Sequence, residues 1–231
     1  MMKKYLILCL LGLAQISAAQ ITSNRGTANM NDGLSLRQTD VKGSPFFIED
    51  WSMGTIIDID GSFKENKTLI YNVYNNNLFL KTGDREKDYI ALQLENIAGF
   101  ILYDKDKTKS FVFSKIKGVQ FQDLKDTDKF YLQVSPKDSK VIIEPLKIFK
   151  DPNSSGWVSS RYNNKAGEFN DITKVYVLAK DNKYHKISLK EKSVLTLFKD
   201  KKEAISNFIK KNNIKIKEAV DLVAIVAYYY Q

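Results

Sequence analysis

Short apolar runs separated by turn residues fill the middle of this 231-residue chain, and they constrain its fold more than any other feature. Clusters such as Asp60-Gly61, Asn75-Asn76-Asn77 and Thr82-Gly83-Asp84 are typical of chain reversals between adjacent strands. The expected strands are 55–59, 69–74, 78–81, 89–94, 100–103, 110–114, 129–134, 173–179 and 184–189. Runs this short and closely spaced predict an antiparallel sheet, in a meander, roll or sandwich, over residues 44–189.

The apolar pattern changes from a strand period to a helical period near the C-terminus. A short helix is expected over 193–198. A second helix is expected to begin at Asp200, because Asp200 and Glu203 have the spacing of an N-cap arrangement. A third is expected over 217–228. The predicted fold class is therefore α+β and β-dominated, an antiparallel sheet with two to three C-terminal helices in 190–231 packed on it.

The N-terminus has the three parts of a secretory signal peptide. Met1–Lys4 is basic, Tyr5–Ala14 is apolar, and Ser17-Ala18-Ala19 supplies the small residues of a cleavage site. The apolar run is too short to span a bilayer, and we expect no transmembrane segment in the mature chain. Residues 1–19 are therefore predicted to direct export through Sec, to the periplasm, the outer membrane or the medium, and 20–43 to form an exposed leader.

Histidine and cysteine occur once each, as His185 and Cys9. Cys9 lies in the predicted signal peptide, so the mature chain has no thiol, which suits an oxidising compartment. Most metal sites and nucleophile–base pairs use these two residue types. We therefore expect no metal site, no cofactor and no catalytic residues, and we expect His185 to be a surface or interstrand residue.

The net charge of the chain is +9, and it is unevenly distributed. Residues 20–173 hold 21 basic and 21 acidic side chains, whereas 174–217 hold 13 lysines and four acids. The favoured interpretation of this lysine-rich segment is a solvated face. The alternative is an anionic partner such as a lipopolysaccharide head group. Nucleic acid is not expected, because the segment has no arginine and the chain carries an export signal.

Aromatic residues beside amide or basic side chains are the remaining candidates for ligand binding. The candidate residues are Trp51, Tyr74, Trp157 and Arg161. Aromatic rings with polar neighbours suit sugar stacking and protein interfaces, although strands also use aromatics simply for packing. A carbohydrate-active enzyme would in addition need acidic residues such as Asp58 or Asp60, which are otherwise acids of a hairpin turn.

Two regions resemble a known group of proteins. The first contains Gly43-Ser44-Pro45-Phe46-Phe47, Glu49-Asp50-Trp51, Gly54-Thr55 and Leu69–Tyr74, and the second extends over 192–229. Both are similar to uncharacterised exported proteins of Bacteroidetes, the phylum of the flavobacteria. The resemblance implies a Gram-negative envelope setting and carries no established activity or catalytic residue.

These observations together predict an exported envelope protein that acts as a non-enzymatic binding or scaffolding module. Its partner would be an envelope protein or a glycan. The alternative is a glycan-binding module or carbohydrate-active enzyme that uses the aromatic and asparagine surface. The sequence leaves the oligomeric state and the specific ligand open.

Overall fold

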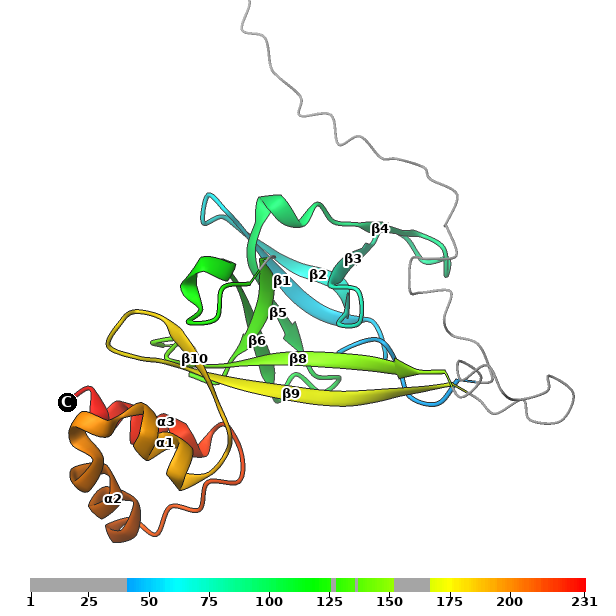
Figure 1. Cartoon of the computed structure of the whole chain (residues 1–231). Helices are drawn as coiled ribbons and strands as arrows, with labels where there is room; N and C mark the ends of the chain where they lie inside the picture. Colours follow the sequence, from blue (N-terminus) through cyan, green and yellow to red (C-terminus); the bar gives the residue numbers. More distant parts are fainter. Residues whose placement is uncertain (1–40, 126–127, 136, 152–166) are drawn as a thin grey trace, which may run out of the picture.

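The computed structural model describes residues 41–125, 128–135, 137–151 and 167–231. Within these ranges, ten strands form one sheet and three α-helices follow it (Figure 1). The strands are β1 Ser52–Asp58, β2 Phe63–Asn72, β3 Asn77–Lys81, β4 Tyr89–Ala91, β5 Ile97–Tyr103, β6 Ser110–Ile116, β7 Lys129–Gln133, β8 Val141–Lys150, β9 Glu168–Leu178 and β10 Tyr184–Ile187. The helices are α1 Glu191–Leu197, α2 Lys202–Lys211 and α3 Asp221–Tyr229. Short 3-10 turns are η2 Leu94–Asn96, η3 Gly118–Gln120 and η4 Lys199–Lys201.

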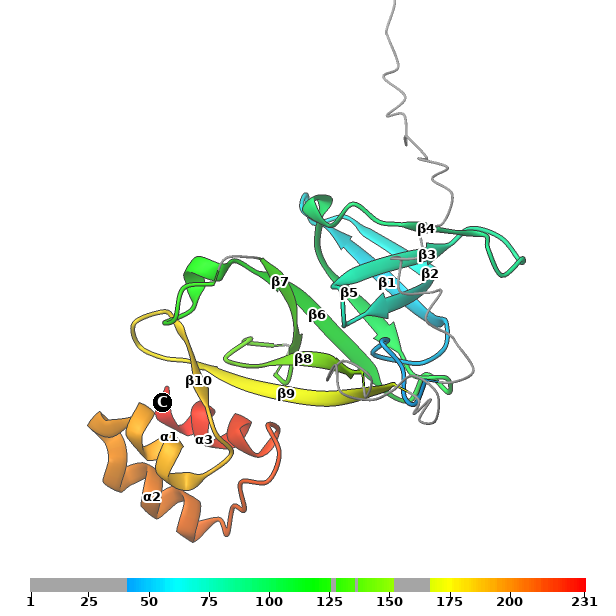
Figure 2. The ribbon, with the colours of Figure 1, turned by 45° about the vertical axis from the view of Figure 1, so that its right-hand side comes forward.

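The sheet is an antiparallel meander with one interruption. Its strand order is β10-β9-β8-β7-β6-β5-β1-β2-β3-β4, so consecutive strands are neighbours except where the chain crosses from β4 back to β5. Every strand pair in this order is antiparallel. The predicted α+β, β-dominated class is thus confirmed. The sheet is strongly curved, and its two ends face different directions (Figure 2).

Aromatic side chains form the core of the part of the sheet that contains β1, β2, β5, β6 and β7. Phe100 and Phe113 are fully buried and stack at 4.7 Å between ring centroids. Tyr71 and Phe130 meet Phe100 edge-on, each at 5.0 Å. Aromatic pairs at these separations add to the stabilisation that burial of their apolar area provides.

Helices α1 and α3 pack on one face of the other end of the sheet, and α2 packs on these two helices. Val175 and Val177 of β9 are buried in one cluster with Leu222 and Ile225 of α3. Tyr176, between the two valines, belongs to a different cluster with Phe121. This division follows from the alternation of side chains along a strand, which sends neighbouring residues to opposite faces. The β9–β10 end of the sheet is therefore covered by helices on one face (Figures 1 and 2).

Strand β8 is absent from the sequence-based prediction. Its sequence contains Pro145, which removes a backbone donor and argues against a central strand. The structure resolves this conflict through the register. The N–H of Val134 donates to the carbonyl of Val141, so the backbone hydrogen-bonding groups of Val141 are directed toward β7. Those of every second residue after Val141, including Pro145, are directed to the same side. The β7–β8 pairing ends at Ile143, and Pro145 therefore faces an edge with no paired strand among the described residues.

The predicted helix start at Asp200 is wrong. Asp200 lies in the 3-10 turn η4, and α2 begins two residues later, with no side-chain hydrogen bond at its N-cap. The Asp200 carboxylate instead accepts a hydrogen bond from Lys180 Nζ at 2.6 Å. A tertiary partner therefore replaces the local helix cap that the spacing to Glu203 indicates.

Candidate functional site: a basic groove beside β10

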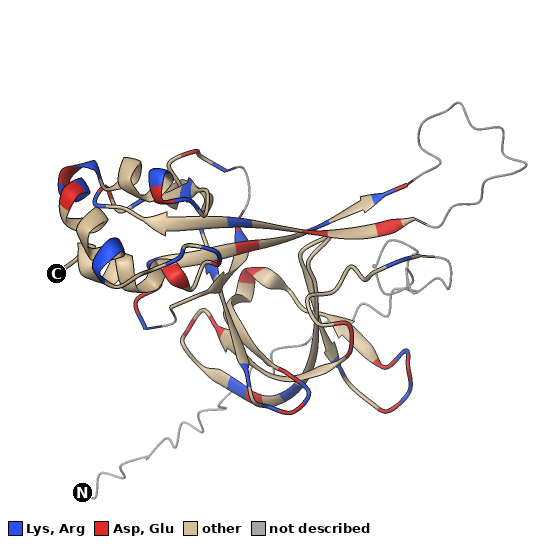
Figure 3. Ribbon diagram, turned by 90° about the horizontal axis from the view of Figure 1, so that it is seen from below, with Lys and Arg blue, Asp and Glu red and all other residues tan. Residues whose placement is uncertain are grey.

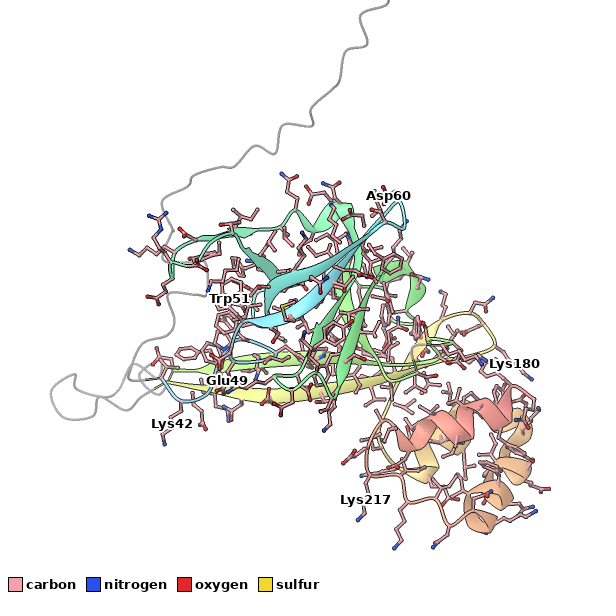
Figure 4. The ribbon with its side chains drawn as sticks, turned by 180° about the vertical axis from the view of Figure 1, so that it is seen from behind. Lys42, Glu49, Trp51, Asp60, Lys180 and Lys217 are labelled. Carbon is pink, nitrogen blue, oxygen red and sulfur yellow. The ribbon has the colours of Figure 1, made fainter. Side chains whose placement is uncertain are left out.

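An open groove of about 1000 Å³ lies between the tip of the β9–β10 hairpin, strand β10 and helix α1. Figure 4 shows Lys180 where the tip of this hairpin meets the helices. The groove is lined by five lysines and two aspartates, together with His185, Gln122 and Tyr229. The charged lining residues are Lys180, Lys186, Lys190, Lys192, Lys199, Asp181 and Asp200. Lysines from β10, from the start of α1 and from the turn after α1 thus lie at one surface.

The turn between β9 and β10 positions one wall of the groove. Asn182 has a φ of 57°, in the left-handed region that asparagine tolerates better than most residues. Its N–H donates to the carbonyl of Ala179, and the N–H of Lys183 donates to the carboxylate of Asp181 at 3.0 Å. Asparagine and aspartate favour such turns because their side chains bond the local backbone. The sequence 180–183 therefore forms the tight hairpin that its composition predicts.

Asp181 and His185 form a pair on the hairpin. His185 Nε2 lies 2.8 Å from Asp181 Oδ2. Desolvation acts to raise the pKa of Asp181, but hydrogen bonds from the His185 ring and from the N–H of Lys183 outweigh it and hold this pKa below its ordinary value. Asp181 therefore stays ionised at neutral pH and fixes the orientation of the histidine ring.

Asp200 is held in the same way at the other side of the groove. It accepts hydrogen bonds from Lys180 Nζ at 2.6 Å and from the Tyr229 hydroxyl at 3.1 Å. The hydrogen bond from Lys180 lowers the pKa of Asp200. The Lys180 ammonium also lies 5.1 Å from the centre of the Tyr229 ring, within the range of a cation–π interaction. Both carboxylates of the groove are thus committed to partners within the protein.

Four of the five groove lysines form no ion pair in the parts of the chain that the structure describes. Among the described residues, no carboxylate lies within ion-pair distance of the ammonium groups of Lys186, Lys190, Lys192 and Lys199. All four residues are solvent-exposed. Figure 3 shows basic positions at this helical end of the long β8–β9 hairpin. A concave surface with several unpaired cations attracts anions.

Comparisons with protein-family models, curated proteins and solved structures found no match. The function is therefore inferred from the site. Across the ranges that the structure describes, no group of three His, Cys, Asp or Glu side chains is arranged to hold a metal ion. No helix in those ranges is long and apolar enough to cross a membrane.

The aromatic candidates lie elsewhere in the molecule. The Trp51 ring lies 6.1 Å from that of Tyr89 and packs on the cluster of Phe46, Ile70 and Phe79. Figure 4 shows Trp51 at the opposite end of the sheet from Lys180. Tyr74 is 48% exposed and meets Phe169 edge-on at 5.4 Å. Trp51 and Tyr74 therefore belong to separate aromatic clusters.

The other two candidates, Trp157 and Arg161, lie outside the described residues.

Asp58 and Asp60 act in the turn between β1 and β2. Asp58 accepts a hydrogen bond from the Ser62 hydroxyl at 3.1 Å and pairs with Lys64 at 2.5 Å. Asp60 accepts a hydrogen bond from the N–H of Ser62, which lowers the pKa of Asp60. A general acid at neutral pH needs a raised pKa, whereas the pKa of Asp60 is lowered.

Sequence reasoning identified the lysine-rich segment but missed the groove. Lys186 comes from β10, Lys190 and Lys192 from the start of α1, and Lys199 from the turn after it. Their convergence depends on how α1 folds back on β10, which charge counts do not contain. The excess of lysine over 174–217 was the signal, and the missing information was the direction of the helix.

Proposed function

We propose that this protein is an exported, non-enzymatic binding module of a Gram-negative envelope, and that the groove beside β10 binds an acidic ligand. The observation that carries the proposal is the set of four groove lysines without a carboxylate partner among the described residues. The N-terminal signal pattern and the resemblance to exported proteins of Bacteroidetes support the export part of it.

The type of cation indicates the kind of ligand. Lysine is a compact, strongly hydrated point charge, whereas arginine offers the planar fork that holds a single phosphate or carboxylate with two bonds. The groove contains lysine and no arginine among its lining residues. It therefore suits a ligand that carries several separated negative charges.

The state of the groove carboxylates favours binding over catalysis. Asp181 and Asp200 both have lowered pKa values because cations or donors stabilise their ionised forms. Neither is a proton donor at neutral pH, and each has its negative charge engaged by a neighbour. The proposed ligand site is the groove rather than Trp51 and Tyr74, because those two rings lie in separate clusters.

Binding of a polyanion to the mature protein tests the proposal. Dextran sulfate is titrated by calorimetry into the wild type and into a variant with Lys186, Lys190, Lys192 and Lys199 changed to Ala. We expect the dissociation constant of this groove variant to rise at least tenfold, because four unpaired charges are lost from one surface.

The matched control changes Lys202, Lys210, Lys211 and Lys215, all exposed lysines in or just after α2, to Ala. It removes the same total charge, and we expect a rise in the dissociation constant of less than threefold. Equal losses in the two variants would show that net charge, and not the groove, governs binding. Absence of dextran sulfate binding by the wild type would contradict the proposed function.

A further inference from the structure

Strand β10 has one paired and one open edge. The N–H of Ala179 donates to the carbonyl of Lys183, which fixes the register of the β9–β10 hairpin. Backbone groups in an antiparallel pair point alternately toward and away from the partner strand. His185 and Ile187 therefore bond to β9, whereas the N–H and C=O groups of Lys186 face the open edge.

A short segment of the protein already occupies the start of this edge. Phe121 forms a parallel bridge with Tyr184, and the N–H of Gln122 donates to the carbonyl of Tyr184 at 3.0 Å. Within the described ranges, no regular strand pairing continues beyond this bridge. Among the described residues, no hydrogen bond satisfies the outward N–H and C=O of Lys186. The start of this edge thus already pairs with another segment. The next outward-facing residue of β10, Lys186, is available to pair with an added chain.

The open edge lies in the basic groove. Lys186, Ile187 and Ser188 all line it. The N–H of Ser188 is already bonded to the Ser193 hydroxyl at 3.1 Å, so Lys186 supplies the available backbone pair. Lys190 and Lys192 follow at the start of α1 and also line the groove. A chain that pairs with Lys186 therefore runs among unpaired ammonium groups.

The charge of this edge determines what is able to pair with it. Lysine on an edge strand discourages pairing between identical copies, because the two positive edges repel each other. An acidic chain reverses this effect, since its carboxylates pair with the same lysines. The edge therefore discriminates against a second copy of itself and in favour of a segment of opposite charge.

We propose that an extended acidic peptide segment binds in the groove by adding a strand to β10 at Lys186. The inference rests on the proposed function and names the class of ligand. In strand addition, main-chain hydrogen bonds provide affinity and the flanking side chains provide specificity. Here the backbone of Lys186 provides the hydrogen bonds, and Lys190, Lys192 and Lys199 select acidic residues.

Two substitutions of one residue separate the backbone from the charge. Lys186→Ala removes the ammonium group and keeps the N–H. Lys186→Pro removes both, and it leaves the β9–β10 hydrogen bonds in place because the N–H of Lys186 faces away from β9. The probe is a fluorescein-labelled peptide of alternating Glu and Val, titrated into the mature protein and followed by fluorescence polarisation.

We expect Lys186→Ala to weaken peptide binding about threefold and Lys186→Pro to weaken it at least tenfold. Circular dichroism melts check that both variants are folded. A second arm uses two N-methylated versions of the same peptide, one methylated at the odd-numbered residues and the other at the even-numbered residues. Each version blocks one of the two hydrogen-bonding edges of the peptide and leaves its charge unchanged. We expect at least one methylated peptide to bind tenfold more weakly to the wild-type protein. This arm decides the matter if the proline variant does not fold.

Dextran sulfate, which has no peptide backbone, distinguishes failure of this inference from failure of the proposed function. Both Lys186 variants should weaken dextran sulfate binding equally. If dextran sulfate requires the groove lysines but the peptide is insensitive to proline and to methylation, strand addition is wrong and the groove remains an anion site. If neither probe depends on the groove lysines, both proposals are wrong.

Discussion

Two parts of the single sheet, β1 to β7 and β8 to β10, bury apolar side chains against different partners. In the first region, rings such as Phe100 and Phe113 from neighbouring strands stack on one another. In the second, the aliphatic side chains of Val175 and Val177 pack on the helices. The rings of the first region therefore pack on one another and on Phe47 of the segment before β1, whereas one face of the second region depends on helices that follow the sheet in the sequence.

The two regions also differ in where their lysines without an ion pair lie. In the first, acids in the turns bind nearby donors, as Asp58 does with Lys64 and Asp88 does with Arg85. In the second, Lys186 and Lys192 have no carboxylate partner among the described residues. The first region also has exposed lysines without an ion pair among the described residues, such as Lys105 and Lys107, but none of them lines the groove. The proposed ligand site therefore lies at the helical end, where several such lysines line one groove.

A buried ionic cluster lies where the two regions join. Glu144 of β8 is 3% exposed, accepts a hydrogen bond from the Tyr176 hydroxyl at 2.9 Å, and pairs with Lys125 at 3.2 Å. Lys129 of β7 reaches the other carboxylate oxygen at 3.5 Å. The cluster thus connects β7, β8 and β9 with Lys125 of the segment before β7.

The largest expected effect on stability comes from a substitution in the aromatic core. Phe100→Ala should lower the free energy of unfolding by about 3–5 kcal/mol, because it removes a fully buried ring and leaves a cavity. Urea denaturation measures the change. Phe63→Ala, at a position 62% exposed in β2, is the control and should change stability by about 0.5 kcal/mol or less. Similar losses for the two would contradict a core in this region.

The next effect concerns the junction. Glu144→Gln should lower the free energy of unfolding by about 1.5–3 kcal/mol, the range for hydrogen bonds to charged groups. Asp171→Asn breaks an ion pair with Lys147 in which the aspartate side chain is 78% exposed, and should cost about 0–1 kcal/mol. An equal loss of unfolding free energy in the two variants would contradict a larger contribution from the buried cluster than from the exposed pair.

The pH dependence of the same cluster is a smaller and separate effect. Desolvation raises the pKa of Glu144, but the Tyr176 hydroxyl and Lys125 outweigh it and hold the pKa below the ordinary 4.5. A depressed carboxyl pKa contributes stability that is complete above the unfolded value and is lost as pH falls through the folded value. The stability gap between wild type and Glu144→Gln should therefore be constant above about pH 5.5 and shrink below pH 4.5. A gap that widens in acid would reverse the assigned sign.

The smallest expected effect on stability is at the groove. Replacing Lys186, Lys190, Lys192 and Lys199 with Ala should change the free energy of unfolding by about 1 kcal/mol or less, because these exposed charges make no ion pair in the described structure. Urea denaturation of this variant, compared with the α2 lysine variant, measures the change. A much larger loss in the groove variant would mean that these lysines support the fold rather than a ligand.

The antiparallel sheet followed directly from the alternation of apolar residues and from turns such as Asp60-Gly61. Strand β8 did not, because the effect of Pro145 depends on which edge of the strand it faces, and this is set by pairing with β7 and β9. The role of Asp200 was also hidden. Its helix-capping pattern is local, whereas its actual partners, Lys180 and Tyr229, are distant in the sequence.

The groove shows the same limit. The lysine excess was visible in the sequence, but the identity of the unpaired lysines depends on where Asp181 and Asp200 find their partners. Trp51 and Tyr74 illustrate the converse. Both are candidates because of the residues beside them in the sequence, and the fold places each in a different aromatic cluster.

Zero-length crosslinking identifies which lysines contact a bound acidic peptide. A carbodiimide joins carboxylates of a bound polyglutamate peptide to lysine amines in contact with them, and mass spectrometry of the protein identifies the modified lysines. We predict that crosslinks concentrate at Lys186, Lys190, Lys192 and Lys199, and that excess dextran sulfate suppresses them. Crosslinks spread equally over these residues and the exposed lysines of α2, such as Lys202 and Lys210, would contradict it.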